Sequence, residues 1–137
     1  MLLALDVGNS NISAGLFDKD GELKFLAALD TDSRKTADQI AVDLMNLFQL
    51  YHFDLSLVTG SIYCSVVPPM NFMIEKALFR LIGKLPLKVG PGVRTGLNIR
   101  TEIHNQLGTD IVSGAVAAIE KYEAPIIMID MGTATTF

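Results

Sequence analysis

Short apolar runs alternate with polar turns over the first thirty residues. Leu2–Val7 is an apolar run that ends at Gly8–Asn11, the pattern of a buried strand leading into a tight turn. Apolar character resumes over Ile12–Phe17 and Leu23–Leu29, and the polar stretch Asp18–Gly21 between them offers a glycine for a positive φ. These patterns predict a three-strand antiparallel meander.

Helical spacing follows the meander. Thr36 and Gln39 have the spacing of a capping box, and apolar residues then recur on one helical face. A Pro pair and Gly83 bound a second predicted helix. We expect helices over Met70–Ile82 and Thr109–Tyr122, and strands over Leu55–Ser65, Leu85–Val89 and Ile126–Asp130. The order βββαβαβ-loop-αβ is typical of the α/β class, in which helices pack on a mixed sheet.

The beginning and the end of the chain resemble each other. LLALDVGNSN near the start and IIMIDMGTATTF at the end both read as four apolar residues, Asp, an apolar residue, Gly and small polar residues. Asp6 corresponds to Asp130, and Gly8 to Gly132. This echo predicts a duplicated domain, with 1–124 as the first copy and 125–137 as the start of the second. We therefore expect the 137 residues to be a fragment, or another polypeptide to supply the rest, because a first strand without partners leaves backbone groups unpaired.

Composition narrows the classes of function. Half of the residues are hydrophobic and 19% are charged, which favours a folded globular protein. The net charge of −4 argues against binding to nucleic acid or to an anionic membrane, because both attract basic surfaces. Cys64 is the single cysteine, so an internal disulfide framework is excluded. No signal-peptide or membrane-span pattern is present, and we expect a cytoplasmic protein.

The turn after the first strand has the chemistry of a phosphate and cation site. Gly8 lets the backbone approach an oxyanion closely, and Asn9, Ser10 and Asn11 add hydrogen-bond donors. Asp6 is suited to Mg²⁺, which usually takes one or two protein carboxylates plus substrate phosphates. Two such turns facing each other would clamp a polyphosphate. The chain has neither a P-loop nor a G-x-G-x-x-G spacing.

Asp110 stands at the start of the third predicted helix. Two interpretations remain open for it. An acid at this place caps a helix or compensates its dipole. The same carboxylate is also a candidate general base if a substrate hydroxyl lies beside it.

Five motifs together resemble those of the type III pantothenate kinases. They are DVGNSN at 6–11, SVVPP at 65–69, VGPGVRTGLNIR at 89–100, GTD at 108–110 and DMGTATTF at 130–137. The resemblance runs through the whole chain and implies a ribonuclease H-like, actin-like ATPase domain, the first of two. It implies ATP-dependent phosphorylation of pantothenate to 4'-phosphopantothenate, the first step of coenzyme A biosynthesis. It further implies a homodimer that requires Mg²⁺ and a monovalent cation, K⁺ or NH₄⁺.

The resemblance also implies roles for particular residues. Asp110 would be the general base for the pantothenate hydroxyl, and Asp130 would hold the monovalent cation. Residues bordering pantothenate would be Thr101, Gly108, Thr109, Asp110 and Ile111. Residues contacting ATP would be Asp6, Val7, Gly8, Asn9, Ser10, Asn11, Ile12, Ser13 and Thr133.

Two departures from the family pattern fall on the acceptor side. Ile111 stands where the family usually has Arg, and Thr101 where a Tyr is common. Two alternatives therefore stay open: a non-catalytic regulatory relative, of the kind described as accessory transcription factors, and a phosphotransferase with another acceptor. Because little of a second domain is present, we expect weak or no ATP turnover by residues 1–137 alone.

Overall fold

The computed structural model describes residues 1–90, 93–100, 108–131 and 135–136. Two compact units divide the chain, Met1–Lys88 and Val89–Phe137, and each is described by itself. The predicted domain boundary between residues 124 and 125 rests on a sequence repeat and stays a prediction. Among the described residues, no helix is long and apolar enough to cross a membrane.

The first unit is built on a five-stranded sheet of order β3-β2-β1-β4-β5. The predicted meander is confirmed, because β1 pairs antiparallel with β2 and β2 antiparallel with β3. β4 and β5 add parallel strands on the other side of β1, which makes the sheet mixed. The strands are β1 Leu2–Val7, β2 Asn11–Phe17, β3 Leu23–Asp30, β4 Gly60–Ser65 and β5 Leu87–Lys88.

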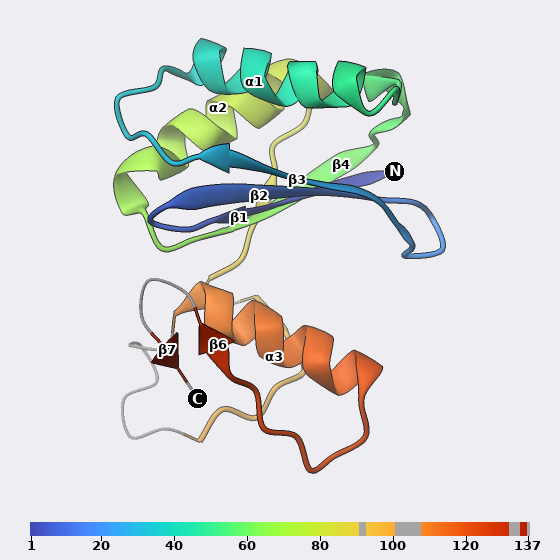
Figure 1. Ribbon diagram of the computed structural model, residues 1–137, viewed down its shortest axis with the longest axis vertical. Coiled ribbons are helices and arrows are strands. Elements are labelled where there is room, and N and C mark those ends of the chain that lie inside the picture. The colour runs from blue at the N-terminus through green and yellow to red at the C-terminus, as the bar shows by residue number, and fades with distance from the viewer. Residues whose placement is uncertain (91–92, 101–107, 132–134, 137) are drawn as a thin grey trace. The chain divides into compact units, whose positions relative to one another are not determined.

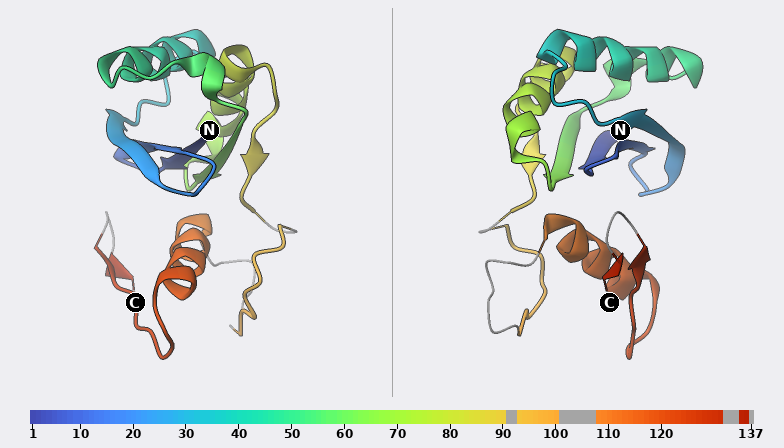
Figure 2. Two further views of the ribbon diagram at one scale, coloured as in Figure 1. Left: turned by 90° about the vertical axis from the view of Figure 1, so that its right-hand side faces the viewer. Right: turned by 60° about the vertical axis from the view of Figure 1, so that its left-hand side comes forward.

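Two helices cover one face of this sheet, as Figures 1 and 2 show. They are α1 Ala37–Leu50 and α2 Asn71–Ile82. Side chains alternate across a strand, so Leu3, Leu5 and Val7 enter the core with α1 and α2. Asp6 points to the opposite face, where Leu26 is 61% exposed. The α/β class predicted from the element order is confirmed.

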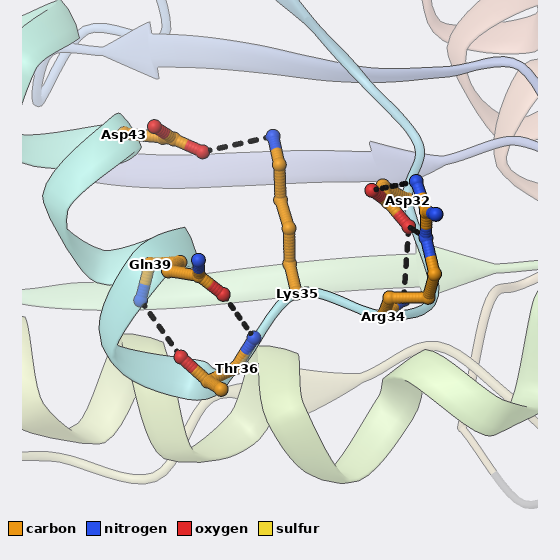
Figure 3. A network of polar contacts seen from close by, with 6 residues as sticks. All are labelled: Asp32, Arg34, Lys35, Thr36, Gln39 and Asp43. Carbon is orange, nitrogen blue, oxygen red and sulfur yellow. Dashed lines mark hydrogen bonds and ion pairs between the residues drawn. The ribbon is translucent and has the colours of Figure 1, made fainter.

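The start of α1 is fixed by the predicted capping box. The Gln39 amide N–H donates to Thr36 Oγ1 at 3.3 Å, and the Thr36 N–H donates to Gln39 Oε1 at 2.9 Å. Figure 3 shows this pair beside the Lys35–Asp43 ion pair. Two of the orphan donors of the first turn are thus satisfied, which sets where the chain leaves β3 for the helix layer.

Three predicted strands are shorter in the structure. Leu55–Leu57 forms a 3₁₀ turn because the Asp54 carboxylate caps it, accepting from the Ser56 N–H at 2.8 Å. The next strand pairs only over Leu87–Lys88. Of the expected strand Ile126–Asp130, only Asp130 is in a strand, and Ile127 is 87% exposed. Apolar runs alone predicted these strands, but a strand also needs a neighbour to pair with.

The described residues of the second unit form one helix and one pair of short antiparallel strands. α3 spans Thr109–Lys121, close to its predicted bounds. β6 Asp130–Met131 pairs antiparallel with β7 Thr135–Thr136. A side chain at Gly114 of α3 would meet Met128 Sδ at 2.9 Å, so this glycine allows the helix and the segment before β6 to pack closely.

Candidate nucleotide site

The turn between β1 and β2 is closed by one backbone hydrogen bond. The Gly8 N–H donates to the Asn11 carbonyl at 2.9 Å. A Cβ at Gly8 would lie 3.1 Å from that same oxygen, tighter than ordinary contact. Gly8 is absent from the glycines with positive φ in the described residues, so its role here is close approach and not a left-handed conformation.

Thr31, the residue after β3, makes two hydrogen bonds to this turn. Its hydroxyl donates to the Gly8 carbonyl at 2.7 Å, and its N–H donates to the Ser10 carbonyl at 2.9 Å. Two carbonyls of the turn are therefore engaged within the protein. Sequence reasoning missed Thr31, although the meander register, which pairs Asn11 with Asp30, places it next to Ser10.

The side chains of the turn divide into an exposed and a buried set. Asn9, Ser10 and Asn11 are exposed, as a phosphate-binding role requires. Val7 and Ile12 are predicted to contact ATP, but their side chains are in the hydrophobic core at 0% and 2% exposure. These two residues can offer a nucleotide only their backbone groups.

Asp6 lies between two neighbouring strands on the sheet face that α1 and α2 leave open. It is directly opposite Ser13 of β2 and Cys64 of β4. The Cys64 thiol donates to Asp6 Oδ1 at 3.1 Å. Cys64 is buried at 6% exposure, and its bond to Asp6 does not follow from any sequence pattern.

The SVVPP motif lies beside the DVGNSN motif. β1 and β4 are parallel, so their carboxyl ends meet at the same edge of the sheet. The Val66 N–H donates to the Val7 carbonyl at 3.0 Å, and the Val67 N–H donates to Ser65 Oγ at 3.0 Å. The structure thus brings together two motifs that lie far apart in the sequence. Ligands commonly bind at the carboxyl ends of the strands in α/β sheets.

Asp110 belongs to the second unit, in the first turn of α3. Its Oδ1 accepts from the Ile111 N–H at 2.8 Å, and a side chain at Gly108 would collide with its carboxylate. Gly108 is the N-cap and makes no side-chain cap bond, so the Asp110 carboxylate accepts a hydrogen bond from a backbone N–H of the first turn instead. Thr109 follows Gly108, and its carbonyl accepts from the Ser113 hydroxyl at 2.8 Å.

The remaining predicted site residues are placed in part. Asp130 is exposed at the start of β6, paired in register with Thr136. Thr101 and Thr133 lie outside the described residues. Within the described part of the chain, no three His, Cys, Asp or Glu residues gather as a metal cluster. Asp6 alone still suits Mg²⁺, because this ion is commonly held by one or two carboxylates together with substrate phosphates.

Comparison with known proteins agrees with the motifs. The sequence profile described as "Type III pantothenate kinase" matches residues 2–137. A protein of that name from Brevibacillus brevis is 44% identical over 137 residues, all of this chain and 53% of the relative. Relatives of the same name from Listeria welshimeri and Listeria monocytogenes are 40% and 39% identical, each covered to 52%. The chain spans about half the length of these relatives, and it belongs to the type III pantothenate kinase family.

Proposed function

We propose that this chain carries the phosphate-binding turn of an ATP-dependent pantothenate kinase, which yields 4'-phosphopantothenate in the first step of coenzyme A biosynthesis. The observation that carries the proposal is the turn at Gly8. It is fastened by Thr31, it exposes Asn9 and Asn11, and it stands beside Asp6 at the carboxyl edge of β1 and β4. Relatives that bear the kinase name match this chain over its whole length.

The residues at the turn fit a magnesium–nucleotide complex. Asp6 is an exposed carboxylate, and the neighbouring amide and hydroxyl side chains are donors for phosphate oxygens. We assign Asp6 to Mg²⁺, which would neutralise charge on the transferring phosphoryl group. Asp130 is assigned to the monovalent cation, K⁺ or NH₄⁺, and Thr133 to an ATP contact. Ser13, half-buried opposite Asp6, is assigned to ATP together with the residues of the turn.

Asp110 is the proposed general base. It accepts the proton of the pantothenate hydroxyl as that oxygen attacks the γ-phosphorus of ATP and ADP departs with the bridging oxygen. Its half-buried position at a helix N-terminus, with one oxygen held by the Ile111 N–H, fixes the orientation of the carboxylate. Gly108, Thr109, Ile111 and Thr101 are assigned to the border of the pantothenate site.

The test is phosphate transfer from ATP to pantothenate by the complete product of the gene that encodes this chain. Because a positioned base contributes about 10²- to 10⁴-fold, Asp110→Asn is expected to lower kcat by at least ~100-fold while nucleotide binding persists. Glu120→Gln, exposed on the same helix, is the matched control and keeps full activity. An active Asp110→Asn variant would remove the base assignment. Absence of transfer by the wild type would refute the kinase proposal.

A second candidate function is favoured by Ile111, which places an apolar side chain where the family usually has Arg. In that case the protein binds nucleotide as a regulatory relative or phosphorylates another hydroxyl acceptor. Nucleotide binding without pantothenate turnover, followed by a screen of other alcohols, separates these outcomes from the kinase.

The homodimer, the monovalent-cation requirement and the cytoplasmic location are proposed on the family resemblance. Sedimentation of the purified gene product tests the dimer. Its rate of phosphate transfer in K⁺, NH₄⁺ and Na⁺ buffers tests the monovalent-cation requirement. Fractionation of cells tests the cytoplasmic location.

A further inference from the structure

The thiol of Cys64 and the carboxylate of Asp6 meet because of strand register. β1 and β4 are parallel and pair Asp6 with Cys64, so the two side chains leave the sheet on the same face. The thiol donates to Asp6 Oδ1 at 3.1 Å, which joins two residues 58 positions apart. This contact does not follow from the DVGNSN motif, since its second partner belongs to another strand.

The two partners differ sharply in burial. Cys64 is 6% exposed, so packing fixes the position of its sulfur atom. Asp6 is exposed, and an exposed Asp side chain is otherwise free to exchange among staggered rotamers. The buried partner therefore orients the exposed one, and not the reverse.

We propose that Cys64 is a positioning residue, which holds the Asp6 carboxylate in one rotamer so that it meets the magnesium–nucleotide complex already oriented. The assignment of Asp6 to that complex rests on the proposed function. The orientation of Asp6 by Cys64 does not rest on it, because it follows from the register and the hydrogen bond.

The expected effect is modest. A thiol is a weak donor, and freeing Asp6 among three staggered rotamers lowers the competent fraction by about threefold. The hydrogen bond acts by holding this rotamer, so removal of the thiol is expected to weaken binding of the metal–nucleotide complex by about threefold. The fold itself stays unchanged.

The first measurement reads the rotamer directly. Three-bond Hα–Hβ couplings of Asp6 are recorded by NMR for the 137-residue chain and for Cys64→Ser, Cys64→Ala and Cys64→Val. Wild type and the Ser variant, which keeps a donor, are expected to show couplings of one rotamer. The Ala and Val variants are expected to show averaged couplings. Ser61→Ala is the matched control, because Ser61 is equally buried on β4 but lies on the other face, and it leaves Asp6 unchanged.

The second measurement reads the consequence for the ligand. Mn²⁺·ATP serves as the probe, and its paramagnetic broadening of the Gly8 amide signal is titrated for each variant of the complete gene product. The proposal expects weaker titration in the Ala and Val variants and wild-type titration in the Ser variant and in Ser61→Ala. Circular dichroism confirms that all variants are folded.

The outcomes separate the inference from the proposed function. Unaveraged Asp6 couplings in both Cys64→Ala and Cys64→Val overturn the positioning role whatever the nucleotide does. Averaged couplings with unchanged Mn²⁺·ATP titration overturn its link to the ligand. If the wild type shows no broadening at Gly8 at any Mn²⁺·ATP concentration, the proposed nucleotide site fails, and with it the metal half of the inference, while the couplings still decide the orientation of Asp6.

Discussion

Replacement of Gly8 by alanine separates the stability of the turn from its proposed function. The added Cβ would lie 3.1 Å from the Asn11 carbonyl oxygen, so the turn must open by a few tenths of an ångström. That movement stretches the 2.9 Å bond from the Gly8 N–H to the same oxygen. Part of a hydrogen bond is then lost, a cost of about 0.5–1 kcal/mol.

The same replacement also has a stabilising component. Because Gly8 is not among the glycines that need a positive φ, alanine restricts the unfolded chain without straining the folded backbone, which stabilises by roughly 0.4–1 kcal/mol. The two contributions nearly cancel. We expect the free energy of unfolding of Gly8→Ala to stay within about 1 kcal/mol of wild type.

Nucleotide binding responds differently. The methyl group and the opened turn keep a phosphate oxygen away from the backbone N–H groups, and a hydrogen bond to a charged group contributes about 1.5–3 kcal/mol. Nucleotide affinity is therefore expected to fall by roughly 10- to 100-fold. Urea unfolding followed by circular dichroism gives the stability, and titration of the complete gene product with a fluorescent ATP analogue gives the affinity.

Gly83→Ala is the matched control for this experiment. Gly83 ends α2 with φ of 74°, where an alanine is strained and costs about 1 kcal/mol. It is expected to lose stability and keep nucleotide affinity, the reverse of Gly8→Ala. The reasoning is refuted if Gly8→Ala binds nucleotide within twofold of wild type, or if it loses more than about 2 kcal/mol of stability.

Two further predictions concern the same unit. Thr31→Val removes the 2.7 Å hydrogen bond to the Gly8 carbonyl and is expected to cost about 1 kcal/mol in urea unfolding, whereas Thr31→Ser keeps it; equal losses in both variants would contradict the role of the hydroxyl. Burial and the Glu75 carboxylate raise the pKa of Tyr63 above its ordinary value of 10.0, so the unfolded chain releases this proton first and stability declines above that pH. Tyr63→Phe is expected to flatten the decline in the free energy of unfolding measured from about pH 9 to 11, whereas Tyr122→Phe, at an exposed position, leaves the decline unchanged. Equal slopes in the two variants would be evidence against the linkage.

Local sequence rules predicted the elements whose cause is local. The Thr36–Gln39 capping box and the Gly83 helix end depend on residues within one turn, and both are found where expected. Asp54 shows the limit of this reasoning. An apolar run after it suggested a strand, but its side chain captures the Ser56 N–H and begins a 3₁₀ turn instead.

The candidate site was predictable only in its first strand and turn. The repeated Asp-x-Gly pattern indicates Asp6 and Gly8, because these residues lie close together in sequence. Thr31 and Cys64 reach the same place through the registers of β3 and β4. No pattern in the sequence encodes which residue of a distant strand lies opposite Asp6, because a shift of one residue turns every side chain to the other face.

The division of the chain into two units bears on how the functional alternatives can be told apart. Gly8 and its partner Thr31 belong to the first unit, and their bonds are made within it. Asp110 and Ile111 belong to the second. A substitution at Ile111, which we propose borders the acceptor, can therefore change the acceptor while the turn at Gly8 keeps its contacts. It follows that loss of nucleotide binding in Gly8→Ala is expected for a pantothenate kinase, for a kinase of another alcohol and for a regulatory relative alike. Whether an acceptor is phosphorylated, and which one, distinguishes them, and so the acceptor assay decides the function.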